Sequence, residues 1–184
     1  MYRKCATEVS ALHQKQVTES LLELMQKMPY EEITVTALCQ ASGVTRRTFY
    51  HLFNNKTGAL YALIDHAIQG IESYRPDMPQ ETLRAILYWK DQKKLLDALR
   101  KNQMNGLLLE RMIECVMNEG FDVRYWLKLR GWGDEKDVVV FCLSGFMGII
   151  YRWYYSGFRE SPEEMAALLE TIMTTPLAGS GTHQ

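Results

Sequence analysis

Apolar residues recur at steps of three and four along most of the chain, which is the spacing of one face of an α-helix. The clearest stripe, in a helix expected over residues 10–28, is formed by Val17, Leu21, Leu24, Met25 and Met28. No segment shows a convincing run of the strict apolar–polar alternation that is typical of a half-buried strand. The periodicity therefore predicts an all-α fold.

Glycine and proline divide this pattern into separate helices. After the first helix, which Pro29 ends, helices are expected over residues 35–42, 45–53 and 56–73. Two prolines within residues 74–79 forbid a continuous helix and mark the best domain boundary. Beyond it the expected helices are 80–88 or further, 92–101, 104–119, 135–156 and 162–174.

The chain is thus expected to form two domains, residues 1–75 and 76–175. Gly120 precedes residues 121–134, and Gly131 and Gly133 lie within them, so we expect a loop or a short irregular helix there. Residues 176–184 are expected to be a disordered tail.

The composition is that of an ordinary soluble globular protein, with 47% hydrophobic residues and a formal net charge of −1. The longest nearly unbroken apolar stretch, Val138 to Tyr151, is shorter than the ~20 residues of a membrane-spanning helix. No apolar block follows the basic residues near Met1, so no secretory signal is expected. We therefore expect a cytoplasmic protein that makes no membrane contact.

The cysteines are expected to be reduced thiols, because they lie far apart and have no histidine at metal-ligand spacing. They are Cys5, Cys39, Cys115 and Cys142. No metal site and no cofactor are predicted. An enzyme is the competing class of protein, but the sequence has no evident Ser/His/acid set, phosphate-binding Gly loop or metal cluster.

Charge is unevenly distributed along the first domain. No Asp or Glu occurs between Ile33 and Ile64, whereas three basic residues do: Arg46, Arg47 and Lys56. A locally cationic surface favours an anionic partner, although acid-free stretches of this length also occur by chance.

The helix expected over residues 45–53 has two distinct faces. At about 100° per residue, Phe49, Leu52 and Phe53 fall within one sector, and Phe49 and Phe53 are expected in the core. The residues that point away from this sector are Arg47, Tyr50 and His51. Two short helices joined by a Gly-containing turn, the second with basic and hydrogen-bonding side chains outward, form a helix-turn-helix motif. The second helix of this motif enters the major groove of DNA.

The residues themselves strengthen this interpretation. The string contains Ile33-Thr34-Val35, the turn Ala41-Ser42-Gly43-Val44-Thr45, the triplet Thr48-Phe49-Tyr50, and then Phe53 and Lys56. Over residues 17–64 it resembles the N-terminal domain of TetR-family transcriptional regulators. The resemblance implies a homodimer with a small DNA-reading domain and a larger C-terminal domain, which senses a ligand and forms the dimer interface.

Three positions depart from the family pattern. Leu52 stands where His or Tyr is most frequent, which removes one possible DNA contact. Ser42 replaces the usual Ala, and Thr57-Gly58-Ala59 replaces the commoner acidic pair and Leu.

The resemblance and the helix geometry together give a set of DNA-binding residues. The set is Thr34, Thr36, Thr45, Arg46, Arg47, Thr48, Tyr50, His51 and Lys56. Tyr50 and Lys56 match the phosphate-contacting positions of the family, and a phosphate at a helix N-terminus suits Lys56. Arg47 is the first choice for pairing with a guanine, and Arg46 is the candidate for binding a phosphate instead.

Some of these roles have a plain alternative. Thr34 and Thr36 flank the start of their helix, so that one of the two is expected to cap it instead of binding a phosphate. Thr45 is placed to cap the next helix. His51 is either a DNA contact or a solvated surface histidine.

The second domain indicates a dimer interface. The helix around Val138 to Trp153 is apolar on every side and needs cover all round, for which a partner subunit is the natural source. Small residues on it allow another helix to approach closely, and the last helix supplies a second apolar face. The predicted interface residues are Phe141, Ser144, Gly145, Gly148, Ile149, Trp153, Leu168, Leu169 and Ile172.

The remaining aromatic and methionine side chains of this domain suit either an adaptable ligand pocket or a plain core. The pocket candidates are Trp89, Met112, Cys115 and Tyr125. We expect a ligand-responsive repressor that binds a palindromic-like operator as a homodimer. The alternatives are an activator or a factor controlled by a protein partner and, more distantly, a helical interaction protein or an enzyme.

Overall fold

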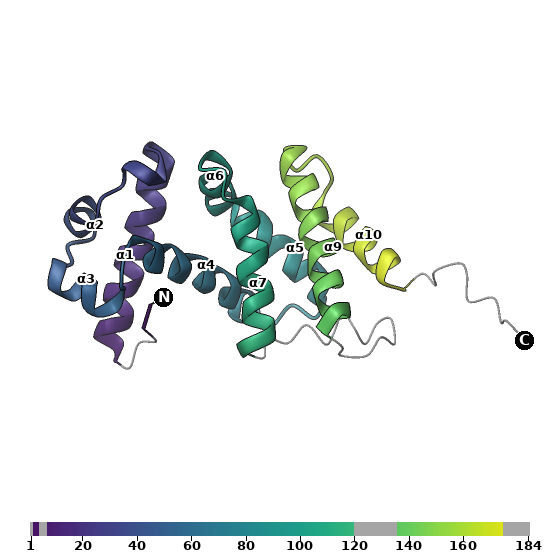
Figure 1. Ribbon diagram of the computed structural model, residues 1–184. Helices are drawn as coiled ribbons and strands as arrows, with labels where there is room; N and C mark the ends of the chain where they lie inside the picture. Colours follow the sequence, from purple (N-terminus) through teal and green to yellow (C-terminus); the bar gives the residue numbers. More distant parts are fainter. Residues whose placement is uncertain (1, 4–6, 120–135, 175–184) are drawn as a thin grey trace, which may run out of the picture.

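The computed structural model describes residues 2–3, 7–119 and 136–174. Within these ranges the protein is all-α, as predicted, with nine α-helices and no strand. The labels follow Figure 1, in which α8 is not used. The expected loop at 121–134, which contains Tyr125, and the expected tail at 176–184 lie outside the described residues.

The first four α-helices and a short 3-10 helix, η1, form one end of the molecule, here called the head (Figure 1). Their bounds are α1 Glu8–Lys27, η1 Tyr30–Glu32, α2 Val35–Ser42, α3 Arg46–Leu52 and α4 Lys56–Ser73. The other helices form the body. Their bounds are α5 Glu81–Asp91, α6 Lys93–Lys101, α7 Asn105–Glu119, α9 Lys136–Tyr155 and α10 Pro162–Thr174.

The observed bounds lie close to the predicted ones, and α1 shows why small differences arise. It begins at Glu8 instead of residue 10 because Thr7 and Ser10 form a capping box. The Thr7 hydroxyl accepts a hydrogen bond from the Ser10 amide, and the Ser10 hydroxyl accepts one from the Thr7 amide, both at 3.2 Å.

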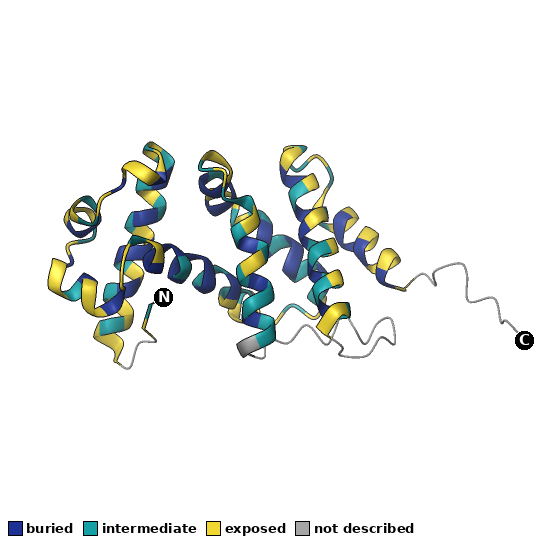
Figure 2. Cartoon of the chain, viewed as in Figure 1, coloured by how far each residue is buried: buried dark blue, intermediate teal, exposed yellow. Residues whose placement is uncertain are grey.

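Helix α4 connects the head to the body. It packs against α1 at one end and against α7 at the other, and buried residues follow it through the centre of the molecule (Figure 2). Phe49 and Phe53, at 0% and 1% exposure, pack beside it, so that the head and body share one continuous apolar core. The expected core positions of the head are confirmed.

Helix α9 buries only one face within the subunit. This face includes Leu143, Met147 and Ile150, whereas Phe141 is 68% exposed on the opposite side. Helix α9 has 20 residues, more than the apolar stretch Val138 to Tyr151 within it. By length and composition alone, it is a helix that could cross a membrane. Within the structure it packs against α5 and α7.

Two predicted interface residues are corrected by this packing. Trp153 and Leu169 are 0% and 2% exposed and therefore belong to the core of the subunit itself. The Trp153 indole N–H donates to the Glu160 carbonyl at 3.0 Å, which holds the loop after α9 against the helix. The periodic pattern could not separate the inward face from the outward face, because both are apolar.

Candidate nucleic-acid interface

Local hydrogen bonds fix the two short helices of the head. Thr34 caps α2 by accepting the Ala37 amide at 3.1 Å, and Thr45 caps α3 by accepting the Thr48 amide at 3.2 Å. Between them Gly43 has φ 70°, a left-handed conformation that glycine adopts without strain. The angle between α2 and α3 is therefore set by residues of the turn itself.

Helix α3 points its polar residues outward. Phe49 is 0% exposed and Leu52 only 3%, so Leu52 contributes to the core and offers nothing to DNA. Tyr50 is 47% exposed, and Arg47 and His51 are exposed beside it. The side of α3 that the sequence assigned to DNA is thus accessible.

An open hollow of about 490 Å³ lies over this face of α3. The residues that line it are Arg3, Arg47, Thr48, Tyr50 and His51. None of them is acidic, so the described wall of the hollow is cationic and rich in hydrogen-bond donors. Arg3, which precedes α1, was not among the predicted site residues.

Arg46 and Arg47 differ in what they contact. Arg46 donates from Nη1 to the Thr36 hydroxyl at 2.7 Å, and its guanidinium lies 5.7 Å from the centre of the Tyr50 ring. It therefore bridges α2 and α3. Within the described part of the chain, Arg47 makes no hydrogen bond or ion pair, which leaves its guanidinium available for a partner molecule.

Lys56 starts α4 but points back at the connector between α1 and α2. Its ammonium donates to the Tyr30 carbonyl at 2.6 Å and to the Glu31 carbonyl at 3.2 Å, and it lies 4.1 Å from the centre of the Tyr30 ring. The first turn of α4 is capped by Asn55, which accepts the Gly58 amide at 2.9 Å. Two of the three donors of Lys56 are thus used inside the protein, and the third has no hydrogen-bond partner among the described residues.

The body holds the same connector from the other side. The Tyr30 amide donates to Oδ1 of Asn102, at the end of α6, at 2.5 Å. Asn102 is itself held by a bond to the Ala98 carbonyl at 2.8 Å. Tyr30 is therefore bound by both the head and the body.

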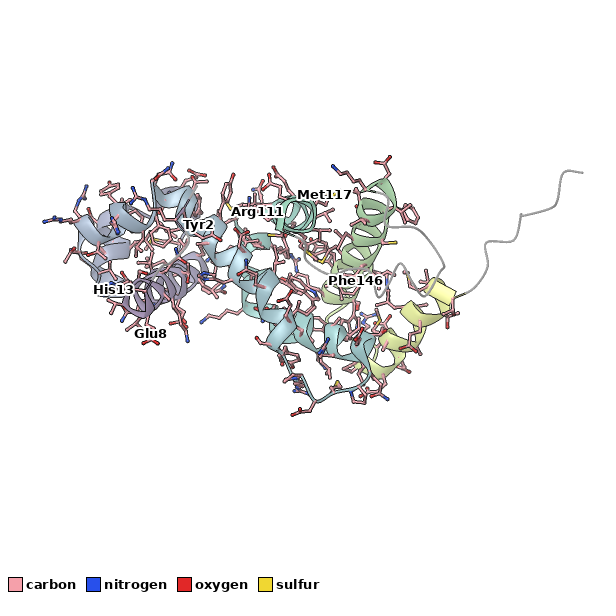
Figure 3. The ribbon with its side chains drawn as sticks, turned by 90° about the horizontal axis from the view of Figure 1, so that it is seen from below. Tyr2, Glu8, His13, Arg111, Met117 and Phe146 are labelled. Carbon is pink, nitrogen blue, oxygen red and sulfur yellow. The ribbon has the colours of Figure 1, made fainter. Side chains whose placement is uncertain are left out.

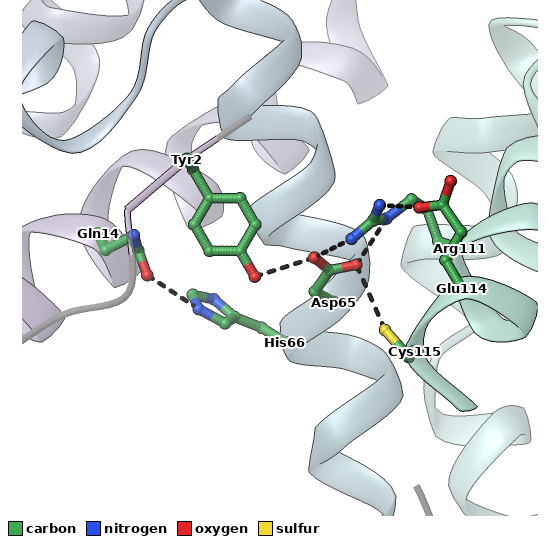
Figure 4. A network of polar contacts seen from close by, with 7 residues as sticks. All are labelled: Tyr2, Gln14, Asp65, His66, Arg111, Glu114 and Cys115. Atoms are coloured by element: carbon green, nitrogen blue, oxygen red, sulfur yellow. Dashed lines mark hydrogen bonds and ion pairs between the residues drawn. The ribbon is translucent and has the colours of Figure 1, made fainter. Parts of the chain in front are cut away.

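A buried polar cluster joins α4 to α7 (Figure 4). Asp65 is 1% exposed and accepts two hydrogen bonds from Arg111, at 2.9 Å from Nε and 2.5 Å from Nη2. It also accepts one from the Tyr2 hydroxyl at 2.9 Å. Figure 3 shows Tyr2 and Arg111 close together at the junction of head and body. The hydrogen bond to Asp65, with the charge of Glu114 beside it, raises the pKa of Arg111.

This cluster has no sequence signature, because its members lie far apart in the chain. Of the pocket candidates, Trp89, Met112 and Cys115 are buried at 1%, 4% and 3% exposure. The Cys115 thiol lies 3.8 Å from Oδ1 of Asp65. Tyr125 lies outside the described residues.

The predicted dimer face remains partly open in the subunit. Gly145 and Gly148 are exposed, and a Cβ built at either position would meet nothing within 4 Å. Leu168 and Ile172 of α10 are 40% and 42% exposed. Ser144 and Ile149 are partly exposed.

A helix-turn-helix with an open cationic recognition helix, joined to a helical body, defines a class of DNA-binding regulators. Comparison with family models makes the assignment specific. Residues 18–63 match the bacterial regulatory proteins of the tetR family, and residues 77–175 match a transcriptional regulator C-terminal region. The chain therefore belongs to the TetR family of transcriptional regulators. No curated protein matches it.

Proposed function

We propose that this DNA-binding regulator acts as a homodimeric repressor that is released from its operator by an effector. The observation that carries the DNA-binding role is the face of α3, where Arg47, Thr48, Tyr50 and His51 line an open cationic hollow. A helix of this kind enters the major groove, where donor and acceptor patterns distinguish all four base pairs.

Within this surface, we assign base reading to Arg47 and phosphate binding to Tyr50 and Lys56. Arg47 has an unoccupied guanidinium, which suits bidentate pairing with guanine O6 and N7. Arg46 is already bound to Thr36, so a phosphate beside α2 suits it better than a base. Thr34 and Thr45 act mainly as helix caps in this proposal.

The exposed apolar residues of α9 and α10 support a dimer. Phe141, at 68% exposure, is large and apolar, and water-exposed apolar patches mark association surfaces. The exposed glycines of α9 would let the partner's helix approach closely. Two heads in a symmetric dimer would reach major grooves about 34–36 Å apart, or a multiple of that distance, on a palindromic-like site.

Two kinds of effector fit this proposal. A small molecule in the body is the first candidate, since Trp89 is 1% exposed and its indole N–H has no hydrogen-bond partner among the described residues. A buried donor of this kind would gain from a ligand acceptor. A protein co-regulator is the second candidate. We place the protein in the cytoplasm, with its DNA target.

Selection of a binding site from random duplexes, followed by titration, tests the DNA-reading role. Arg47→Ala should weaken binding to the selected site by about 1–3 kcal/mol and relax the preference at one base pair. Binding to random duplex should change little. Arg159→Ala, an exposed change between α9 and α10, is the matched control. Equal weakening on both duplexes would make Arg47 a phosphate contact and transfer base reading to Arg46, Thr48 or His51.

A further inference from the structure

Tyr2 and Arg3, which precede α1, are attached to the end of the recognition helix. The Arg3 amide donates to the Leu52 carbonyl, the last of α3, at 3.0 Å. Tyr2 forms an isolated antiparallel bridge with Phe53. The Arg3 backbone therefore lies beside the C-terminal end of α3.

Buried groups hold this segment from the other side. The Arg3 carbonyl accepts from Nε2 of Gln14 at 3.0 Å, and Gln14 is only 3% exposed. The Tyr2 hydroxyl donates to buried Asp65 at 2.9 Å. Because the backbone of Arg3 is fixed by its own amide and carbonyl, ordering it on binding would cost little conformational entropy.

The side chain of Arg3 faces the DNA-reading surface. Arg3 is exposed, and it lines the hollow together with Arg47, Thr48, Tyr50 and His51. It makes no ion pair among the described residues, so none of these residues neutralises its charge. Arg3 thus adds a second guanidinium to the hollow beside that of Arg47, supplied by a segment outside the helix-turn-helix.

We propose that Arg3 is a further DNA-binding residue, which contacts a phosphate at the edge of the groove that α3 enters. A recognition helix reads bases mainly with its N-terminal residues, whereas Arg3 is anchored at the C-terminal end, where the sugar–phosphate backbone is the nearest anion. Tyr2 is a positioning residue, which holds Arg3 in place through Asp65. The inference rests on the proposed DNA-binding function and extends it.

The test is a set of anisotropy titrations of the full chain on a selected operator and on a random duplex, at several salt concentrations. Arg3→Ala should weaken binding to both duplexes by a similar factor and lower the salt slope by about one unit, because one fewer counterion is released. Arg3→Lys should restore the slope, and Arg3→Glu should weaken binding more than Arg3→Ala. Arg159→Ala should match the wild type.

The role of Tyr2 has its own readout. Tyr2→Phe should weaken operator binding in the wild-type background and have no further effect in the Arg3→Ala background. A structural role of Tyr2 that is independent of Arg3 would weaken binding in both backgrounds. That result would overturn the positioning role.

The outcomes separate this inference from the function on which it rests. If the wild type binds its operator and Arg3→Ala keeps both its affinity and its salt slope, the Arg3 contact is wrong and DNA binding stands. If Arg3→Ala weakens the operator alone, Arg3 reads a base and the phosphate contact is wrong. If the wild type binds no selected DNA, the proposed function itself fails.

Discussion

Removal of the Arg111 guanidinium is expected to be among the most damaging single changes to the fold. Asp65 is 1% exposed and receives two charge-assisted hydrogen bonds from Arg111. Arg111→Met would leave this carboxylate with the Tyr2 hydroxyl and the weak thiol donor of Cys115. Breaking a buried ion pair by removing one partner costs about 3–5 kcal/mol, which is a large part of the roughly 5–15 kcal/mol that stabilises a native protein.

Removal of the Asp65 charge, with Arg111 left in place, should cost less stability. After Asp65→Asn, Arg111 keeps its ion pair with Glu114 and its position 5.0 Å from the centre of the Tyr61 ring. Its side chain is also 17% exposed, against 2% for Asp65, so that water can solvate part of its charge. We expect a loss of about 1–3 kcal/mol for Asp65→Asn. Replacing both charges together, as Asp65→Leu with Arg111→Met, should return the stability to within about 1–2 kcal/mol of the wild type.

Urea unfolding monitored by circular dichroism measures these differences, at one fixed protein concentration because the proposed dimerisation would shift the apparent stability. The expected order of destabilisation is Arg111→Met first, Asp65→Asn second and the double variant least. Equal costs for the two single variants, with additive costs in the double variant, would show that the cluster is not a coupled buried pair.

Three further predictions follow from other parts of the molecule. Gly148→Glu should leave a folded subunit, since a Cβ meets nothing within 4 Å there, but it should break the dimer in sedimentation by burying a charge. Lys56→Ala should lower stability by about 1–3 kcal/mol in urea, because the ammonium binds the Tyr30 and Glu31 carbonyls. Burial lowers the pKa of His66 more than nearby Asp65 raises it, so His66 should make wild-type stability fall as the pH drops below about 6.5.

Each of these has a matched comparison. Gly106→Glu is the control for Gly148→Glu, since Gly106, on α7, is also exposed and has nothing within 4 Å of an added Cβ. An intact dimer of the Gly148→Glu variant would show that the interface lies elsewhere. Lys27→Ala, at the exposed end of α1, is the control for the loss of a positive charge. Equal stability of the Lys27→Ala and Lys56→Ala variants would contradict the stabilising role of the Lys56 hydrogen bonds. The lowered folded pKa of His66 means that unfolding takes up a proton, and His66→Gln should therefore flatten the pH profile. An unchanged profile would refute this.

The helices of the head could be predicted because their signals are local. Gly43 and the Thr45 cap lie within a few residues of the helices that they limit, and a sequence displays them directly. The same holds for Phe49, whose inward direction follows from helix geometry. By contrast, the predicted phosphate contact Lys56 bonds with carbonyls of Tyr30 and Glu31, and no local pattern indicates this.

Longer-range features could not be predicted for a related reason. Asp65 and Arg111 are each unremarkable polar residues of an amphipathic helix, and only the packing of α4 on α7 brings them together. Trp153 looked like an interface residue because α9 is apolar on all sides, and which side faces α5 and α7 depends on the whole fold. Arg3 carries no motif at all. Its place beside α3 depends on a backbone hydrogen bond to Leu52.

The attachment of Tyr30 to both head and body makes its amide a probe of the junction between them. Its amide is bonded to the side chain of Asn102, at the end of α6, so separation of α6 from the connector would expose it to deuterium exchange. The protection of this amide therefore gives the free energy of opening the junction, whereas the amide of Phe49, inside α3, gives that of opening the head. An effector that separates the two regions would release the first proton and leave the second protected.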